Sequence, residues 1–96
     1  MRSYEMMMIL NSQLDEEAIE AILEKATSII ISKNGEITKV EKWGKRRLAY
    51  EVKGTTEGFY VVIEFVADNE ATVEVERVLK ITEEVLRFLL VRKDEE

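Results

Sequence analysis

The residues best placed to do chemistry are the cations between Lys39 and Arg47, where the chain reads K-V-E-K-W-G-K-R-R. This segment holds five basic residues and one acidic residue, whereas the whole chain has 14 basic and 20 acidic residues and a formal net charge of −6. Basic side chains neutralise phosphates, and this attraction supplies much of the affinity of proteins for nucleic acids. A basic segment can act locally in an acidic protein because charges beyond a Debye length of about 8 Å are largely screened.

Lys45, Arg46 and Arg47 lie around a bend expected at Gly44, with Trp43 beside it. On a strand, guanidinium groups held in this way could contact phosphate oxygens bidentately. The same charges could instead be a solvated strand edge that discourages sheet-to-sheet aggregation, a common use of basic residues. Composition by itself leaves both interpretations open. For Trp43, packing beside the bend is favoured over stacking on a base.

The chain lacks the residues from which most catalytic sites are built. It has no Cys and no His, which removes thiolate nucleophiles, disulfides, the commonest metal ligand and the commonest general base. We therefore expect no enzyme activity, no cofactor, no metal site and no small-molecule substrate.

The length and hydropathy of the chain indicate one small domain. Ninety-six residues leave little room for a deep pocket. No apolar run approaches the roughly 20 residues that a membrane-spanning helix needs, and the start of the chain does not read as a signal peptide. We expect a cytoplasmic protein with no membrane partner, a single domain over residues 1–92 and a short charged tail over 93–96.

The first half of the chain predicts a strand, a helix and a long strand. Residues 4–10 alternate, and Asp15 is a plausible N-cap for a helix whose apolar residues recur every three or four positions. Asn34-Gly35 ends that helix, since glycine is the usual residue where the chain turns left-handed. Residues 36–52 favour one long strand bent or bulged near Gly44, with a hairpin there as the lesser alternative.

The second half predicts a strand over 59–67 after a turn over 53–58, a helix capped by Asp68 or Asn69, and a last strand over 85–91. In the last strand Phe88 and Leu90 are expected to face the core. Both faces of the 59–67 strand are apolar. A solvated face should be polar, so we interpret the second face as a partner surface, the alternative being that the end of the chain covers it.

The predicted order β-α-β-β-α-β indicates an α+β domain of the ferredoxin-like kind: a four-stranded antiparallel sheet with both helices on one face. This geometry leaves the other face of the sheet bare. The same architecture hosts many functions. Residues 58–65 resemble an RNA-recognition-domain signature only superficially, because the basic residue before Gly58 and the second small residue are absent.

Several segments together resemble the bacterial small-subunit ribosomal protein S6 family, whose pattern is R-x-Y-E, then G-x-R-x-L-A-Y or G-R-R-x-L-A-Y, then G-x-Y/F. The chain has R-S-Y-E from Arg2, G-K-R-R-L-A-Y from Gly44 and G-F-Y from Gly58, and the similarity extends to the closing strand with Leu86-Arg87-Phe88. It spans nearly the whole chain. Two features depart from the family: Leu86 stands where many relatives carry a basic residue, and the tail is short.

The resemblance implies a structural component of the small ribosomal subunit that binds the central domain of its ribosomal RNA together with ribosomal protein S18. It implies a cytoplasmic, ribosomal location and no catalysis. The residues it assigns to RNA or partner binding are cationic: Arg2, Lys45, Arg46, Arg47, Arg87 and, as a less certain helper, Lys80. The protein-partner surface would contain Trp43, Tyr60 and Val62.

Two other functions are compatible with the predicted fold. A ligand-binding regulatory module would normally be fused to an enzyme, and we expect no second domain in these 96 residues. A small acylphosphatase-like hydrolase would need an anion-cradling loop after the first strand, but residues 11–14 offer neither glycine nor arginine.

Overall fold

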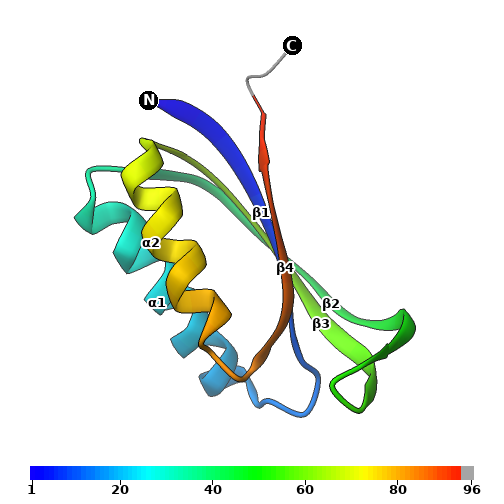
Figure 1. The fold of residues 1–96 in the computed structure, drawn as a ribbon. Helices are drawn as coiled ribbons and strands as arrows, with labels where there is room; N and C mark the ends of the chain where they lie inside the picture. The colour runs from blue at the N-terminus through cyan, green and yellow to red at the C-terminus, as the bar shows by residue number, and fades with distance from the viewer. Residues whose placement is uncertain (94–96) are drawn as a thin grey trace.

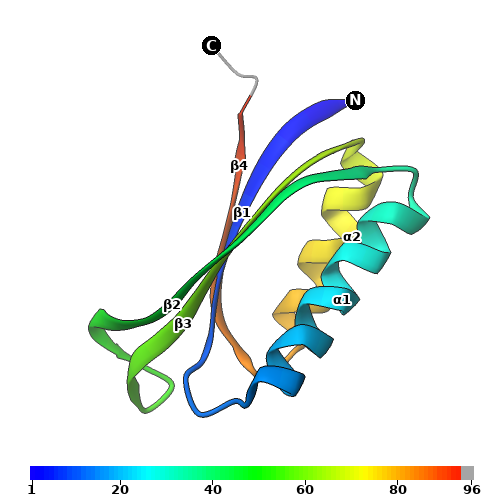
Figure 2. The same ribbon diagram turned by 180° about the vertical axis from the view of Figure 1, so that it is seen from behind.

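The computed structural model describes residues 1–93 as one layer of helices packed on one sheet (Figure 1). In chain order the elements are β1 (Arg2–Asn11), α1 (Glu16–Ser32), β2 (Glu36–Val52), β3 (Thr55–Ala67), α2 (Asn69–Lys80) and β4 (Val85–Arg92). The strand order is β2-β3-β1-β4, and every neighbouring pair is antiparallel. Both helices cover the same face in two opposite views (Figure 1, Figure 2). The predicted ferredoxin-like fold is confirmed.

The core lies between the helices and one face of the sheet. Along β1 the alternation of the pleat buries every second side chain: Tyr4, Met6, Met8 and Leu10. From the helix side they meet the apolar stripe of α1, whose buried members are Ile19, Ile22, Leu23, Ala26 and Ile30. Each large side chain buried in this way contributes about 1.5–3 kcal/mol. The predicted alternation of β1 and the predicted apolar stripe of α1 are therefore confirmed.

The ends of α1 are fixed by two different devices. Asp15 is the N-cap, and its Oδ1 accepts a hydrogen bond from the backbone N–H of Ala18 at 2.8 Å, as predicted. At the other end it is Asn34, with φ 68°, that adopts the left-handed conformation. Gly35 is instead required by close packing, because a Cβ there would lie 2.6 Å from Cγ2 of Ile30. The prediction that glycine makes the left-handed turn was wrong.

The second strand, β2, is continuous and bulged, as predicted. Gly44 has φ 88°, and the register with β3 shifts between Lys42 and Gly44. The turn that follows is tighter than expected: Lys53 and Gly54 have φ values of 50° and 80°, as a two-residue hairpin requires, and β3 already begins at Thr55. Gly58 lies inside β3 rather than in a turn.

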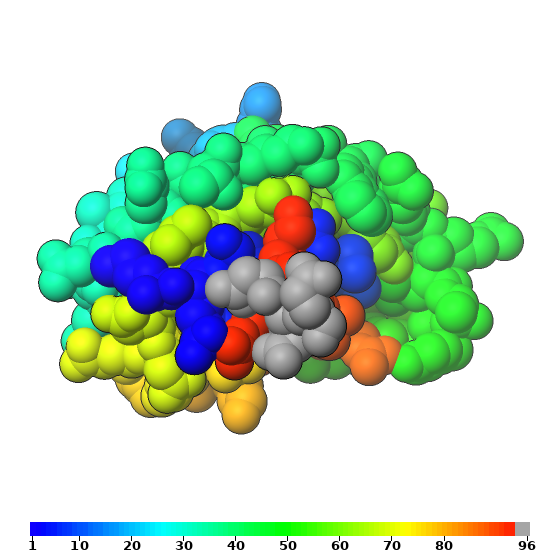
Figure 3. Space-filling model, turned by 90° about the horizontal axis from the view of Figure 1, so that it is seen from above, coloured from blue at the N-terminus to red at the C-terminus, as the bar shows by residue number. Residues whose placement is uncertain are grey.

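The β2–β3 hairpin projects beyond the helices at one end of the molecule (Figure 1). Viewed from above, it extends from one side, away from the start of β1 and the end of β4, which lie together (Figure 3). This projection places the second half of β2 outside the region that α1 covers. The basic segment of the sequence runs into this arm.

The last strand, β4, is one residue longer than predicted, and the residue after it, Lys93, is hydrogen-bonded to the domain. The backbone N–H of Lys93 donates to the carbonyl oxygen of Ser3 at 2.7 Å, and its Nζ donates to Oε1 of Glu64 at 2.9 Å. Lys93, predicted to begin a tail, is thus tied to the domain. The rest of the predicted tail, residues 94–96, lies outside the described residues. Neither helix of the described chain is long and apolar enough to cross a membrane.

Candidate functional site

The pleat of β2 separates the three adjacent cations of the basic segment. Lys45 pairs with Phe59 and, with Leu14 and Ile19, lines a depression on the helix side of the sheet. Arg46 pairs with Gly58 and faces the opposite, open side, and Arg47 returns to the side of Lys45. The sequence suggested a single basic patch. The structure instead places one arginine on the open face and two cations on the other.

Arg46 belongs to an aromatic stack on the open face of the sheet. Its guanidinium lies over the ring of Trp43, with Cζ 5.1 Å from the ring centroid. The rings of Trp43 and Tyr60 are nearly parallel, 5° apart in orientation, with centroids 6.5 Å apart. Stacking fixes the direction of a side chain that would otherwise be free, and it leaves guanidinium N–H groups available for a ligand. Trp43 therefore packs beside the bend, as predicted.

The three residues predicted as a partner surface differ in accessibility. The side chain of Trp43 is 44% exposed, and that of Tyr60 is half-buried. Val62 is on the same face but only 3% exposed, because it sits in the middle of the sheet between its register partners Met7 and Glu41. Val62 offers almost no surface to a partner in this structure, and its role as a contact residue stays a prediction.

Other apolar side chains on the open face are exposed and could contact a partner. Leu89 is 56% exposed and pairs with Met7, and Val91 lies two residues farther along β4. A cavity of about 220 Å³ opens here, lined by Met7, Ile9, Arg87, Phe88 and Leu89. This is below the roughly 300–1,000 Å³ of small-molecule sites, and it suits a single large side chain. Alternation in residues 85–91 predicts Leu89 and Val91 on the face opposite the core, as observed, but they were not assigned to the partner surface.

Arg87 lies at the margin of this cavity and contacts the hairpin. Its guanidinium donates a hydrogen bond to the hydroxyl of Tyr50, and its Cζ lies 5.7 Å from the centroid of the Tyr50 ring. Tyr50 comes from the second half of β2, so the contact joins strands at opposite edges of the sheet. A partner for Arg87 at position 50 could not be read from the sequence.

Lys80 and Arg87 meet at one corner of the molecule together with Lys53, a cation that the sequence did not point to. A depression of about 250 Å³ there is lined by Lys53, Leu79, Lys80, Val85, Leu86, Arg87 and Phe88. Lys53 is at the tip of the hairpin, and its Nζ donates to the carbonyl oxygen of Val85 at 3.3 Å. The only sequence signal was its place before Gly54 in the turn, which says nothing about what the side chain reaches.

Arg2 is distant from this corner. It pairs with Ala67 at the start of β1, whereas Arg87 pairs with Ile9. Ile9 is seven positions after Arg2 along the strand, which is roughly 23 Å at about 3.3 Å per residue. The six predicted cations therefore do not form one site.

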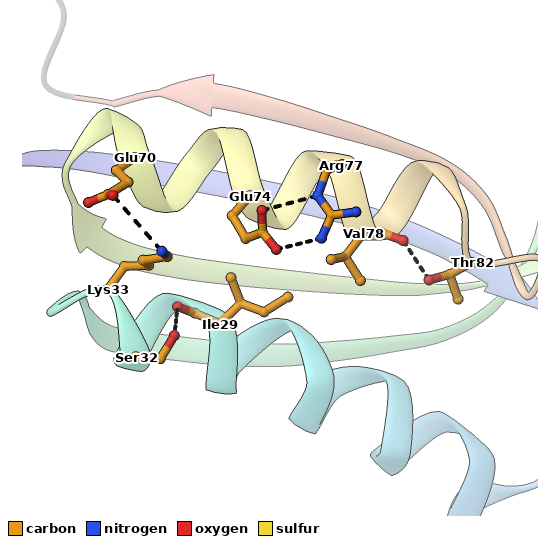
Figure 4. Close-up of polar contacts among 8 residues, drawn as sticks. All are labelled: Ile29, Ser32, Lys33, Glu70, Glu74, Arg77, Val78 and Thr82. Carbon is orange, nitrogen blue, oxygen red and sulfur yellow. Dashed lines mark hydrogen bonds and ion pairs between the residues drawn. The ribbon is translucent and has the colours of Figure 1, made fainter.

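Ion pairs divide the cations of the described chain into two groups. Carboxylates neutralise Lys33, Lys39, Lys42, Arg77 and Lys93. In the helix layer Lys33 lies 3.9 Å from Glu70, and Arg77 binds Glu74 with two hydrogen bonds (Figure 4). These bonds raise the pKa of Arg77 and lower that of Glu74, and the bond to Glu64 raises the pKa of Lys93. These paired cations are already satisfied within the protein.

The cations without a carboxylate partner among residues 1–93 concentrate at the hairpin end. Six of them come from β2, the hairpin tip, the end of α2 and the start of β4: Lys45, Arg46, Arg47, Lys53, Lys80 and Arg87. Unpaired cations on an acidic protein keep their full charge for an external anion. The geometry therefore favours a polyanion at the hairpin end and an apolar partner on the adjoining open face.

Comparison with known proteins agrees with the resemblance in the sequence. The family model described as ribosomal protein S6 matches residues 3–92. The chain is 43% identical to the small ribosomal subunit protein bS6 of Desulforamulus reducens, over 99% of the chain and 100% of that protein. It is 47% identical to the protein of the same name from Thermoanaerobacter pseudethanolicus, with the same two coverages.

A solved structure is also similar over nearly the full length. The crystal structure of 30S ribosomal protein S6 from Thermotoga maritima matches with a TM-score of 0.89 and 38% sequence identity, covering 96% of this chain and 87% of that one. Sequence, length and fold therefore agree on one family.

Proposed function

Because the chain belongs to the ribosomal protein S6 family, we propose that it binds the central domain of the small-subunit ribosomal RNA together with ribosomal protein S18. Family membership makes the chain a structural protein of the small ribosomal subunit rather than an enzyme, and places it on ribosomes in the cytoplasm. We assign its contacts there to two surfaces, one for RNA and one for protein.

The observation that carries the RNA part of the proposal is the group of unpaired cations at the hairpin end. A chain with a net charge of −6 should repel RNA, yet Arg46, Lys53 and Arg87 have no carboxylate partner among the described residues. Phosphate contacts are the largest class of protein–nucleic acid contacts, and arginine binds phosphate oxygens bidentately. We assign the RNA contact to this end of the molecule.

The open face of the sheet supports the protein part of the proposal. Leu89 is more than half exposed, and Met7 and Ile9 line the shallow cavity next to it. Exposed apolar patches of this kind mark interaction sites. We assign this face to ribosomal protein S18, with Trp43 and Tyr60 at its margin.

The two surfaces meet at Arg87, which lines both the apolar cavity and the cationic depression. A basic partner bound to the open face would add positive charge beside the unpaired cations of this chain. The added charge would offset the repulsion between RNA and the acidic residues of the chain. We infer that RNA affinity is low for the isolated chain and increases when S18 is present.

The test is a titration of a central-domain RNA fragment with this chain, with S18 and with both, at graded salt. The expected result is weak binding by each protein alone and tight, salt-sensitive binding by the pair. Two matched variants locate the protein-binding surface. Leu89→Asp on the open face should abolish the complex with S18, whereas Val73→Asp on the exposed side of α2 should not. Tight binding by the isolated chain, unaffected by S18, would contradict the proposal.

A further inference from the structure

We propose that Lys53, Lys80 and Arg87 form a preformed site for one phosphate group of the RNA backbone. This inference rests on the proposed function and adds to it a specific pocket and one residue, Lys53, that neither the sequence pattern nor the family resemblance assigns. The site is distinct from the basic segment around Gly44, from which the RNA contact would be expected.

The three cations come from three separate elements, the β2–β3 turn, the end of α2 and β4, and they converge on a depression of about 250 Å³. The rest of the lining is apolar: Leu79, Val85, Leu86 and Phe88. No acidic residue belongs to the lining, although acidic residues outnumber basic ones in the chain. The depression is smaller than a typical small-molecule site, so its cationic lining rather than its size indicates the ligand.

Two of the three cationic side chains are already held in place. Lys53 donates one hydrogen bond to the carbonyl oxygen of Val85, and an ammonium group has two further N–H donors. Arg87 is held by the hydroxyl and the ring of Tyr50, and a guanidinium has five N–H donors. Holding the side chains before the ligand arrives lowers the entropy cost of binding.

The positive charge of the depression is not neutralised from within. None of the three cations has a carboxylate partner within the described chain. Lys80 by itself has a simpler explanation, because a cation in the last turn of α2 is stabilised by the helix dipole. That explanation does not extend to Lys53 and Arg87, which reach the same depression from the hairpin and from β4. Three converging positive charges without an internal anion fit a phosphate.

The experiment measures the salt dependence of RNA affinity for the complex of this chain with S18, between about 50 and 200 mM potassium chloride. Lys53→Gln and Lys80→Gln each remove one cation, and Lys25→Gln is the matched control, since Lys25 is exposed on α1 and unpaired within residues 1–93. For each of the two site variants, the slope of log affinity against log salt should become shallower by about one unit. The control should keep the wild-type slope.

Further comparisons distinguish the loss of a phosphate contact from a change in the structure of the hairpin. Lys53→Arg should retain the wild-type slope, because it keeps the charge. Lys80→Gln removes no internal hydrogen bond of the described chain, so a changed slope cannot be attributed to a loosened hairpin. Unchanged slopes in both Gln variants would overturn the site while leaving the proposed function standing. Failure of the wild-type complex to bind RNA would overturn both.

Inorganic phosphate titrated into the isolated chain, followed by amide resonances, distinguishes the source of the anion. Shifts confined to residues around Lys53, Lys80 and Arg87, combined with the slope changes, support an RNA phosphate at this corner. Phosphate shifts without slope changes would assign the corner to a small free anion and overturn the RNA assignment.

Discussion

For a single cationic residue, what the side chain can bind depends on what already holds it. The guanidinium of Arg77 is paired with the carboxylate of Glu74, whereas among residues 1–93 Arg46 and Arg87 contact aromatic rings and, for Arg87, a hydroxyl. A cation over an exposed ring gains about 0.5–1 kcal/mol, which orients the guanidinium without consuming its charge. The two arginines are therefore positioned but still able to bind an anion.

The contact between Tyr50 and Arg87 should be visible as energetic coupling in RNA binding. If Arg87 acts through its contact with the hairpin, Tyr50→Phe and Arg87→Lys should give non-additive losses of affinity, with a coupling of about 0.5–3 kcal/mol in the double variant. A double-mutant cycle measured with the S18 complex checks this. Additive losses would mean that Arg87 binds its ligand independently of Tyr50.

Core and surface residues should separate cleanly when stability and binding are measured side by side. Leu79 is 1% exposed, so Leu79→Ala should lower the free energy of unfolding by about 2–5 kcal/mol. Arg46→Ala and Arg47→Ala should weaken assembly and leave folding nearly intact, because surface substitutions usually change stability by less than about 0.5 kcal/mol. Denaturant melts next to binding titrations provide the comparison. Equal losses of stability from all three changes would give the arginines a structural role instead.

Among the secondary-structure elements, the β2–β3 hairpin depends on two glycines for different reasons. Gly54 has φ 80° in the turn, with open space around the position a Cβ would take, whereas a Cβ on Gly58 would be 2.3 Å from Cγ2 of Ile9. Gly54 supplies a left-handed conformation, and Gly58 allows β3 and β1 to approach closely.

The two roles predict opposite tolerance to substitution. Gly54→Asn should cost little, because asparagine tolerates the left-handed region. Gly58→Ala should destabilise the domain by about 1–3 kcal/mol through overpacking against Ile9. Thermal or denaturant melts check both changes, and Ile9→Ala should recover part of the loss in a Gly58→Ala background. A Gly58→Ala variant as stable as the wild type would show that β1 and β3 separate easily here.

The Glu74–Arg77 pair in α2 predicts a small dependence of stability on pH. The hydrogen bond from Arg77 lowers the pKa of Glu74 in the folded protein, so the stabilisation is present above the unfolded-state pKa and is lost as pH falls through the folded-state pKa. Glu74→Gln should therefore melt slightly earlier than the wild type at neutral pH, and the difference should vanish in acid. Exposed pairs contribute little, so the effect is small.

Glu84→Gln is the matched control for the pH experiment. Glu84 is exposed and makes no side-chain ion pair within residues 1–93, so its replacement should leave the acid dependence of the melting temperature unchanged. A Glu74→Gln variant whose deficit persisted at low pH would point to altered packing of α2 rather than to the ion pair.

Across the whole molecule, the fold separates stability from recognition. The helices cover one face of the sheet and form the core there, and their cations Lys33 and Arg77 are paired (Figure 4). The opposite face and the projecting hairpin carry the exposed side chains of Leu89 and Trp43 and the arginines Arg46 and Arg87, which have no carboxylate partner among residues 1–93. We therefore expect substitutions on the open face and the hairpin to change assembly without disturbing the core. Most of the cations without a carboxylate partner among residues 1–93 lie at one end of the molecule, and this concentration of charge is what an acidic protein would need to contact RNA.

Local sequence patterns were sufficient to predict the elements and the family. Period-two alternation in residues 4–10 and 85–91, and apolar spacing of three and four from Ile19, identify the strands and the first helix, and they predict the inward faces of that helix and of the last strand. The composition has no Cys and no His, and this was the basis for expecting no enzyme activity. Motifs spread along the chain were enough to identify the family, since they do not depend on which elements touch.

Which side chains share a surface was settled only by tertiary packing. The pleat and the bulge at Gly44 put Arg46 on the open face and Lys45 on the other, although they are adjacent in sequence. Lys53, Lys80 and Arg87 converge because the hairpin tip reaches the start of β4, a contact between elements far apart in the chain. Periodicity is a property of neighbouring residues, whereas twist, bulges and the placement of a projecting arm are set by packing of the whole sheet, and these bring the cations together.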